Sequence, residues 1–261
     1  MTICIAAIAK EGGEEYIVFS TDHMVSTALG QFEHSIVKYK TLNGNVVAML
    51  AGNPLLFDEL VHIGDTKAGY NGMITAIFEN FKRKRREILQ NELLNAYGVD
   101  ERFIAEALRG PIPNPHVGRI LEIAAKFSLQ TSILLIGFED HRARISEINE
   151  MGMADFRDMN FHTIGSGNAQ AANTLLFQRQ DKCDPLLCTL YNVYKAKRNA
   201  EVLEGVGRDT ELLILSTRGR TKLNEKEINI LSSIYSKELR FGKDHADLSN
   251  IELKGEARAC S

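Results

Sequence analysis

The order of strand-like and helix-like segments is the feature of this sequence that most restricts its fold. An apolar run at residues 3–9 is followed by a turn with two glycines and by a second apolar run at 16–20, which predicts a hairpin. A second pair of strands is predicted at 36–40 and 46–51, joined by a turn through an Asn-Gly pair. The chain is therefore expected to begin with strands only.

Residues 54–127 follow a different pattern. Apolar residues recur there at intervals of three and four as far as Tyr97, as they do on one face of a helix. A segment with three prolines at 109–116 interrupts this pattern, and helical spacing returns at 117–127. We expect the whole stretch to form an extended helical section inside a single domain that spans residues 1–261.

The rest of the chain alternates between the two kinds of element. Strands are predicted at 131–138, 144–149, 161–164 and 210–217, and helices at 169–177, 186–203 and 225–239. Two stacked sheets, each covered on its outer side by helices, would bury all of these apolar faces at once. The predicted fold class is therefore α+β, as a four-layer αββα sandwich with two mainly antiparallel sheets. Periodicity alone does not distinguish this arrangement from other α+β folds.

Composition and charge argue against several classes of function. The net charge of -3 is spread along the chain, so no nucleic-acid partner is predicted. A basic run at 82–86 lies in an amphipathic segment, where its cations are expected on a solvated face, with contact to an anionic surface as the alternative. No apolar run has the length of about 18 residues that a membrane span needs, and the chain starts without a leader pattern. We expect a cytoplasmic protein with no membrane partner.

The cysteines and histidines do not form a recognisable site. Cys4, Cys183, Cys188 and Cys260 have neither the spacing of a zinc site nor the density of a disulfide scaffold, so they are expected to be reduced thiols. The histidines are scattered along the chain without a pair at ligand spacing. No metal and no other cofactor is predicted.

Thr2 is the first candidate for chemistry, because its small side chain is compatible with enzymatic removal of Met1. A free α-amino group has a pKa of about 7.7 to 8.0 and can take the proton of the hydroxyl on the same residue. Asp22 ends the second predicted strand, and Lys38 lies within an otherwise apolar strand. A buried lysine needs a carboxylate partner, so we expect these two residues to pair near Thr2.

In these segments the sequence resembles the proteasome β-subunits and their bacterial relatives, the HslV peptidase and the Anbu proteins. The resemblance covers most of the chain in the order of its elements, and it is strongest at residues 2–53. Its motifs are the strand that begins at Thr2, the Phe-Ser-Thr-Asp sequence that ends at Asp22, Lys38, Ala-Gly-Asn at 51–53, Gly-Ser-Gly at 165–167, and the turn and strand at 205–215.

The resemblance implies a role for each matching residue. Thr2 would be the nucleophile with its own amine as the base, Lys38 the electrostatic activator, and Asp22 the residue that holds Lys38 in place. Ser166 would be a supporting hydrogen-bonding residue, and the backbone N–H of Met49 would stabilise the oxyanion, although the family commonly has glycine there. An apolar pocket for the residue before the scissile bond would be lined by Val25, Ile36, Val47 and Ala51.

The functional hypothesis is a threonine peptidase or amidase that acts through an acyl-enzyme ester on Thr2. Two alternatives remain open, namely a transpeptidase or ligase of the same fold and a non-catalytic ring subunit. The resemblance also implies a peptide or protein substrate and a homo-oligomer such as a ring. It leaves open whether an unfoldase is a partner. The polar residues that support the family's site after its fourth helix have only Asn199 or Glu201 as counterparts.

Overall fold

The structure is a computed structural model that describes residues 2–27, 30–33, 37–64, 69–110 and 114–244. Contacts within the chain divide it into two units, Met1–Leu223 and Asn224–Ser261, where the sequence suggested one domain. The described part of the second unit is one helix, α7 (Glu225–Asp244), which starts where the sequence predicted it.

The first sheet contains the N-terminal hairpin in its centre. Its strand order is β10 (Phe161–Gly165), β1 (Ile3–Glu11), β2 (Glu14–Asp22), β11 (Thr210–Ser216) and β12 (Gly219–Lys222), and all neighbours are antiparallel. Because β1 has a partner on each side, the backbone of the segment that follows Thr2 is fixed by two ladders. Successive residues of β1 are buried on both faces of the sheet.

The second sheet is built from segments on either side of the helical section. Its order is β5 (Tyr39–Asn43), β6 (Val46–Ala51), β7 (Ser132–Glu139), β8 (Arg142–Asn149) and β9 (Gly152–Asp155), again antiparallel throughout. The strand predicted at 36–40 begins later, at Tyr39. A separate hairpin of β3 (Met24–Thr27) and β4 (Gly30–Glu33) was not predicted.

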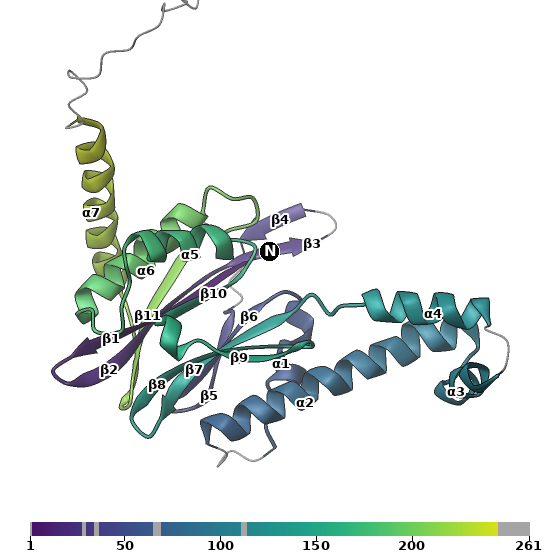
Figure 1. Ribbon diagram of the computed structural model, residues 1–261. Helices are drawn as coiled ribbons and strands as arrows, with labels where there is room; N and C mark the ends of the chain where they lie inside the picture. The colour runs from purple at the N-terminus through teal and green to yellow at the C-terminus, as the bar shows by residue number, and fades with distance from the viewer. Residues whose placement is uncertain (1, 28–29, 34–36, 65–68, 111–113, 245–261) are drawn as a thin grey trace, which may run out of the picture. The chain divides into compact units, whose positions relative to one another are not determined.

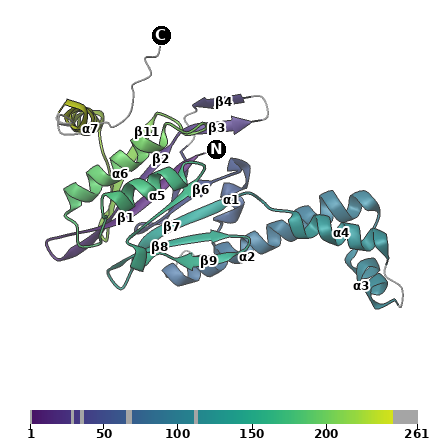
Figure 2. The ribbon, with the colours of Figure 1, turned by 45° about the horizontal axis from the view of Figure 1, so that its top comes forward.

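The two sheets stack face to face with helices on both outer sides (Figures 1 and 2). The core between the sheets includes Phe19 from the first sheet and Val47, Met49 and Leu134 from the second. Helices α5 (Asn168–Phe177) and α6 (Leu186–Ala200) cover the first sheet, and α1 (Phe57–Leu60) and α2 (Tyr70–Ile88) cover the second. The predicted α+β sandwich of two antiparallel sheets is confirmed.

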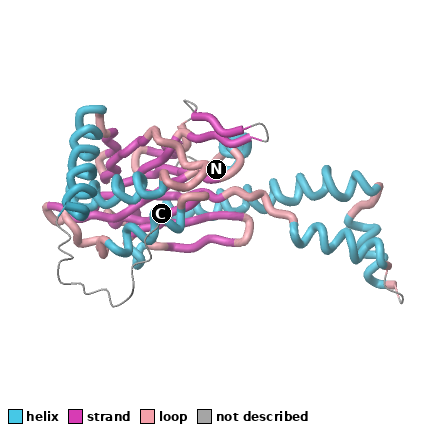
Figure 3. The backbone as a smooth tube through the Cα atoms, turned by 90° about the horizontal axis from the view of Figure 1, so that it is seen from above, coloured by secondary structure: helices cyan, strands magenta, loops and turns pink. Residues whose placement is uncertain are grey.

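The helical section extends beyond the sandwich as a helical arm, residues 82–110 and 114–126 (Figures 1 and 3). After the second half of α2 it contains η2 (Leu89–Leu94), η3 (Asn95–Tyr97), α3 (Glu101–Arg109) and α4 (Pro115–Lys126). Arg85 joins its two sides, because its guanidinium donates to the carbonyl oxygens of Ala124 at 2.9 Å and Phe127 at 3.4 Å. Part of the basic run therefore has a structural role at the C-terminal end of α4.

The described residues also contain two short helices, η1 (Pro54–Leu56) and η4 (Arg157–Met159). Among these residues, no helix combines the length and the apolar character that crossing a membrane requires.

The inward half of α2 should contribute strongly to stability. Ile77 is fully buried in the core between α2 and the second sheet. Its replacement by alanine leaves a cavity, so Ile77→Ala should lower the free energy of unfolding by about 2 to 5 kcal/mol in urea denaturation. Arg83→Ala, at an exposed position of the same helix, should change it by no more than about 0.5 kcal/mol. Equal effects of the two changes would contradict the observed orientation of α2.

A half-buried polar tie connects the two sheets. Glu15 of β2 accepts hydrogen bonds from the Arg157 guanidinium at 2.8 and 2.9 Å and from the backbone N–H of Ala143, in β8, at 2.7 Å. The hydrogen bond from Arg157 holds the pKa of Glu15 below its usual value of 4.5, and the backbone hydrogen bond and the positive charge of Arg157 act in the same direction. The ionised form of Glu15 is therefore stabilised by folding.

This tie predicts a pH dependence of stability. Because folding lowers the pKa of Glu15, its contribution is fully present above the unfolded value and is lost as the pH falls through the folded value. Urea denaturation at about pH 6 and about pH 3.5 should show a smaller acid-induced loss of stability for Glu15→Gln than for the unmodified protein. Glu92→Gln, an exposed control on the helical arm, should keep the full loss. Identical pH profiles for all three proteins would show that the tie between Glu15 and Arg157 does not contribute to the pH dependence of stability.

Candidate active site

Thr2, Asp22 and Lys38 come together at one end of the first sheet, as the sequence predicted. Thr2 immediately precedes β1, and Asp22 is the last residue of β2, whose register places Thr21 opposite Cys4. Lys38 immediately precedes β5 of the second sheet and reaches across to them. All three residues are buried, with Asp22 fully enclosed.

The Lys38 ammonium group is surrounded by three oxygen acceptors. It donates to Thr2 Oγ1, to Asp22 Oδ1 at 2.6 Å and to the carbonyl oxygen of Met24, the first residue of β3. An ammonium has three N–H donors, so each of them has a partner. A positive charge in contact with Oγ1 favours the deprotonated oxygen that a nucleophilic threonine requires.

The Asp22 carboxylate accepts hydrogen bonds at both of its oxygens. Its Oδ1 accepts the Thr2 hydroxyl at 2.5 Å and the Ile3 backbone N–H at 3.3 Å, in addition to Lys38. Its Oδ2 accepts the backbone N–H of Gly207 at 2.8 Å. Both oxygens therefore have donors, which is what a buried carboxylate needs in order to remain charged.

Ser166 and Gly165 hold the backbone of Thr2. The Thr2 N–H donates to Ser166 Oγ at 3.2 Å, and Ser166 Oγ donates in turn to the Thr2 carbonyl oxygen at 3.3 Å. Gly165 has a φ of 102°, and a Cβ there would lie 2.2 Å from the Thr2 carbonyl oxygen. Glycine is therefore required where β10 passes Thr2. Ser166 lies in the supporting position that the sequence predicted.

The proposed oxyanion donor is placed differently. Met49 is fully buried in the core between the sheets, in the middle of β6, and is paired with Tyr39 on one side and Leu134 on the other. A residue paired on both sides has its backbone groups directed along the ladder rather than toward a cavity. The position of Met49 thus conflicts with the predicted role. A glycine, Gly52, follows three residues later.

A cavity of about 600 Å³ opens beside Thr2. It is lined by Thr2, Ala51, Gly52, Asn53, Pro54, Leu129, Gln130, Ser132, Gly165 and Ser166. Every one of these residues is uncharged, so the cavity suits a neutral group. Of the four residues predicted for an apolar pocket, Ala51 lines this cavity. Val47 is instead buried between the sheets, whereas Ile36 and the side chain of Val25 lie outside the described residues.

Gly52 is the residue of this cavity whose role the sequence reasoning missed. It follows β6 with a φ of 121°, and a Cβ there would lie 2.3 Å from the carbonyl oxygen of Gln130. The next residue, Asn53, donates its backbone N–H to Thr131 Oγ1 at 3.2 Å, which fixes the turn. A glycine directly after a strand was the available signal, but the sequence analysis gave Gly52 no role beyond its place in the Ala-Gly-Asn motif.

Cys4 is a second potential nucleophile near Thr2, but its surroundings make it unreactive. It is fully buried, and its thiol donates to the carbonyl oxygen of Leu50 at 3.3 Å. Burial raises the pKa of the Cys4 thiol, and the negative charge of Asp22 raises it further. The thiolate needed for attack is therefore disfavoured, which leaves the Thr2 hydroxyl as the candidate nucleophile of this group. Within the described ranges, no cluster of three or more His, Cys, Asp or Glu is arranged to hold a metal.

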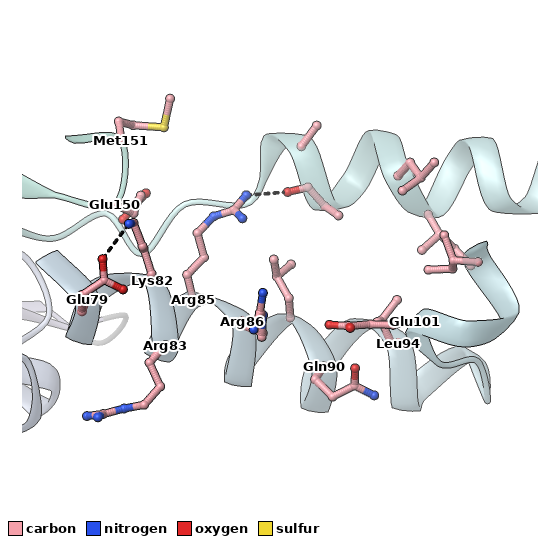
Figure 4. A pocket seen from close by; sticks show the side chains of 16 residues that line it. Glu79, Lys82, Arg83, Arg85, Arg86, Gln90, Leu94, Glu101, Glu150 and Met151 are labelled. Carbon is pink, nitrogen blue, oxygen red and sulfur yellow. Dashed lines mark hydrogen bonds and ion pairs between the residues drawn. The ribbon is translucent and has the colours of Figure 1, made fainter. Parts of the chain in front are cut away.

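A second and larger cavity, of about 910 Å³, lies between the helical arm and the turn at Glu150 and Met151 (Figure 4). Its lining combines the cations Lys82, Arg83, Arg85 and Arg86 with apolar residues such as Leu94. Lys82 is paired with Glu79 at 2.7 Å. None of the residues that line the Thr2 cavity contributes to it, so the two cavities are separate.

No protein-family model matches the chain, and no curated protein matches it.

The close approach at Gly165 predicts a local effect of one methyl group. Gly165→Ala should push the Thr2 carbonyl away from β10 and break its hydrogen bond with Ser166, which a crystal structure of the variant would show. Gly12→Ala is a matched control, because Gly12 also has a positive φ, of 60°, but a Cβ there meets nothing within 4 Å. The control should lose only modest stability, about 1 kcal/mol, from backbone strain. An undisturbed Thr2 in Gly165→Ala would refute the close contact.

Proposed function

We propose that this protein is an N-terminal-nucleophile hydrolase, a threonine peptidase or amidase that becomes active when Thr2 is the first residue of the chain. The observation that carries the proposal is the buried contact of the Lys38 ammonium with Thr2 Oγ1 and Asp22 Oδ1. A lysine is costly to bury, and here its charge is directed at a hydroxyl oxygen. The resemblance to the proteasome β-subunits, HslV and Anbu supports the same reading.

The proposed reaction uses the amine and the hydroxyl of one residue. The Thr2 amine takes the hydroxyl proton as Oγ1 attacks the carbonyl carbon of an amide, and a tetrahedral intermediate forms. When the C–N bond breaks, the leaving amine takes a proton from the Thr2 ammonium, and an ester remains on Oγ1. Water then attacks the ester and transfers a proton to the Thr2 amine. As the ester C–O bond breaks, the Thr2 ammonium returns this proton to Oγ1, which restores the hydroxyl, and the carboxylic acid leaves.

The surrounding residues supply position and charge in this scheme. Ser166 Oγ lies 3.2 Å from the Thr2 nitrogen and would orient the free amine once the preceding residue is removed. Lys38 would stabilise the developing alkoxide, while Asp22 holds Lys38 in place. The backbone at Gly52 borders the cavity beside Thr2, and we assign the oxyanion donor to this turn instead of to Met49.

The substrate side of the proposal is a peptide or protein with an uncharged group next to the scissile bond. The uncharged lining of the Thr2 cavity supports this choice. A homo-oligomer, such as a ring, follows from the family resemblance and is part of the same proposal. The cytoplasm is the proposed compartment, consistent with Cys4, Cys183 and Cys188 being free thiols.

The proposal is tested with protein whose first residue is shown by intact mass to be Thr2. A library of peptides with fluorogenic amide leaving groups should reveal turnover, and Thr2→Ala should reduce kcat by about 1000-fold or more. Lys38→Ala should approach the same loss, whereas Thr2→Ser should retain measurable activity because it keeps a hydroxyl. Thr41→Ala, in β5 and outside the Thr2 cavity, serves as the control.

Two results would overturn this proposal. One is normal turnover by Thr2→Ala, and the other is the absence of any turnover across the library with a verified N-terminal Thr2. An added amine nucleophile separates hydrolysis from transpeptidation, because a ligase would divert most of the ester to the amine product.

A further inference from the structure

A second buried lysine lies behind the candidate active site. Lys197 is on α6 and has no exposed surface, yet it takes no direct part in the contacts of Thr2. Its ammonium donates to Glu201 Oε1 at 2.5 Å and to the carbonyl oxygens of Gly207 at 2.7 Å and Arg208 at 2.9 Å. All three N–H donors of the lysine are therefore used, and two of them hold one loop.

That loop contacts the catalytic carboxylate. The backbone N–H of Gly207, whose carbonyl is bound by Lys197, donates to Asp22 Oδ2 at 2.8 Å. The opposite oxygen of Asp22 accepts from the Thr2 hydroxyl and from Lys38. A continuous series of hydrogen bonds thus leads from the helix through the loop to the nucleophile.

We propose that Lys197 is a positioning residue, which fixes the loop at 205–208 so that the Gly207 N–H holds Asp22 in the orientation that places Lys38 against Thr2. The expected loss of kcat rests on the proposed function, whereas the expected displacement of the Gly207 N–H from Asp22 does not. Lys197 occupies the region where the family resemblance left only Asn199 or Glu201 as polar candidates. Lys197, which the sequence analysis did not name, takes this supporting role.

The two loop carbonyls explain why a hydrogen-bond donor is needed at position 197. A neutral apolar side chain would leave the two loop carbonyls without donors inside the protein. Burial lowers the pKa of Lys197, and the negative charge and hydrogen bond of Glu201 oppose this shift. Arg198 adds a second cation to Glu201, at 2.7 Å from Oε2, which secures the carboxylate from its other side.

Lys197→Met tests the proposal, because methionine keeps an unbranched chain of similar length but has no donors. A crystal structure of the variant should show the Gly207 N–H displaced from Asp22 Oδ2. The variant should lose about 100-fold in kcat, as expected for misplacement of a catalytic group, with little change in KM. Glu201→Gln should show a smaller loss in the same direction, and it replaces the methionine variant if that protein does not fold.

Ile77→Ala is the control for a merely structural role. It is expected to destabilise the fold from the far side of the second sheet, so its kcat should stay close to that of the unmodified protein. If Lys197→Met retains the hydrogen bond between Gly207 and Asp22, or loses it without any fall in kcat, the positioning role is wrong. A fall in kcat matched by Ile77→Ala at equal loss of stability would also overturn it.

The failure of this inference can be told apart from failure of the proposed function. Should the unmodified protein with a verified N-terminal Thr2 turn over no substrate, the hydrolase proposal is refuted. The crystallographic comparison of the Gly207–Asp22 distance then still decides whether Lys197 holds the loop.

Discussion

A lysine, an aspartate and a threonine buried in mutual contact form the interaction on which the candidate site depends. Desolvating the Lys38 ammonium is unfavourable, and the cost is offset only because Asp22, Thr2 and the carbonyl of Met24 each accept one of its hydrogen bonds. Such a group is stable only if all members remain in place, which requires a rigid support. The support comes from β1, which is paired on both sides, and from the end of β5 in the opposite sheet.

Segments on two sides of this group restrain Thr2 and Asp22. Gly165 allows β10 to pass close to the Thr2 carbonyl, and Ser166 binds the Thr2 backbone from the same turn. On the opposite side, the loop held by Lys197 binds the outer oxygen of Asp22. The cavity with its uncharged lining lies beside Thr2, so space is available next to this buried group.

Much of the fold could be predicted from the sequence because its strands are long apolar runs and its helices have clear three- and four-residue spacing. The pairing of Asp22 with Lys38 followed from the cost of burying a lysine. The short strands β3, β4, β9 and β12 were not predicted, since a strand of four residues has little periodicity of its own. Met49 was misassigned because a ladder position is set by register, and Lys197 was overlooked because its acceptors are backbone carbonyls, which carry no sequence signal.

The claim that most needs a direct test is that one residue supplies both nucleophile and base. A peptide epoxyketone can react with the hydroxyl through its ketone and with the amine through its epoxide, and so requires both groups on the same residue. After incubation of the protein with such a reagent, intact mass and peptide mapping should show one adduct per chain, on Thr2 as the first residue. A chain that keeps Met1 and is nevertheless active, or an adduct on any other residue, would contradict the account.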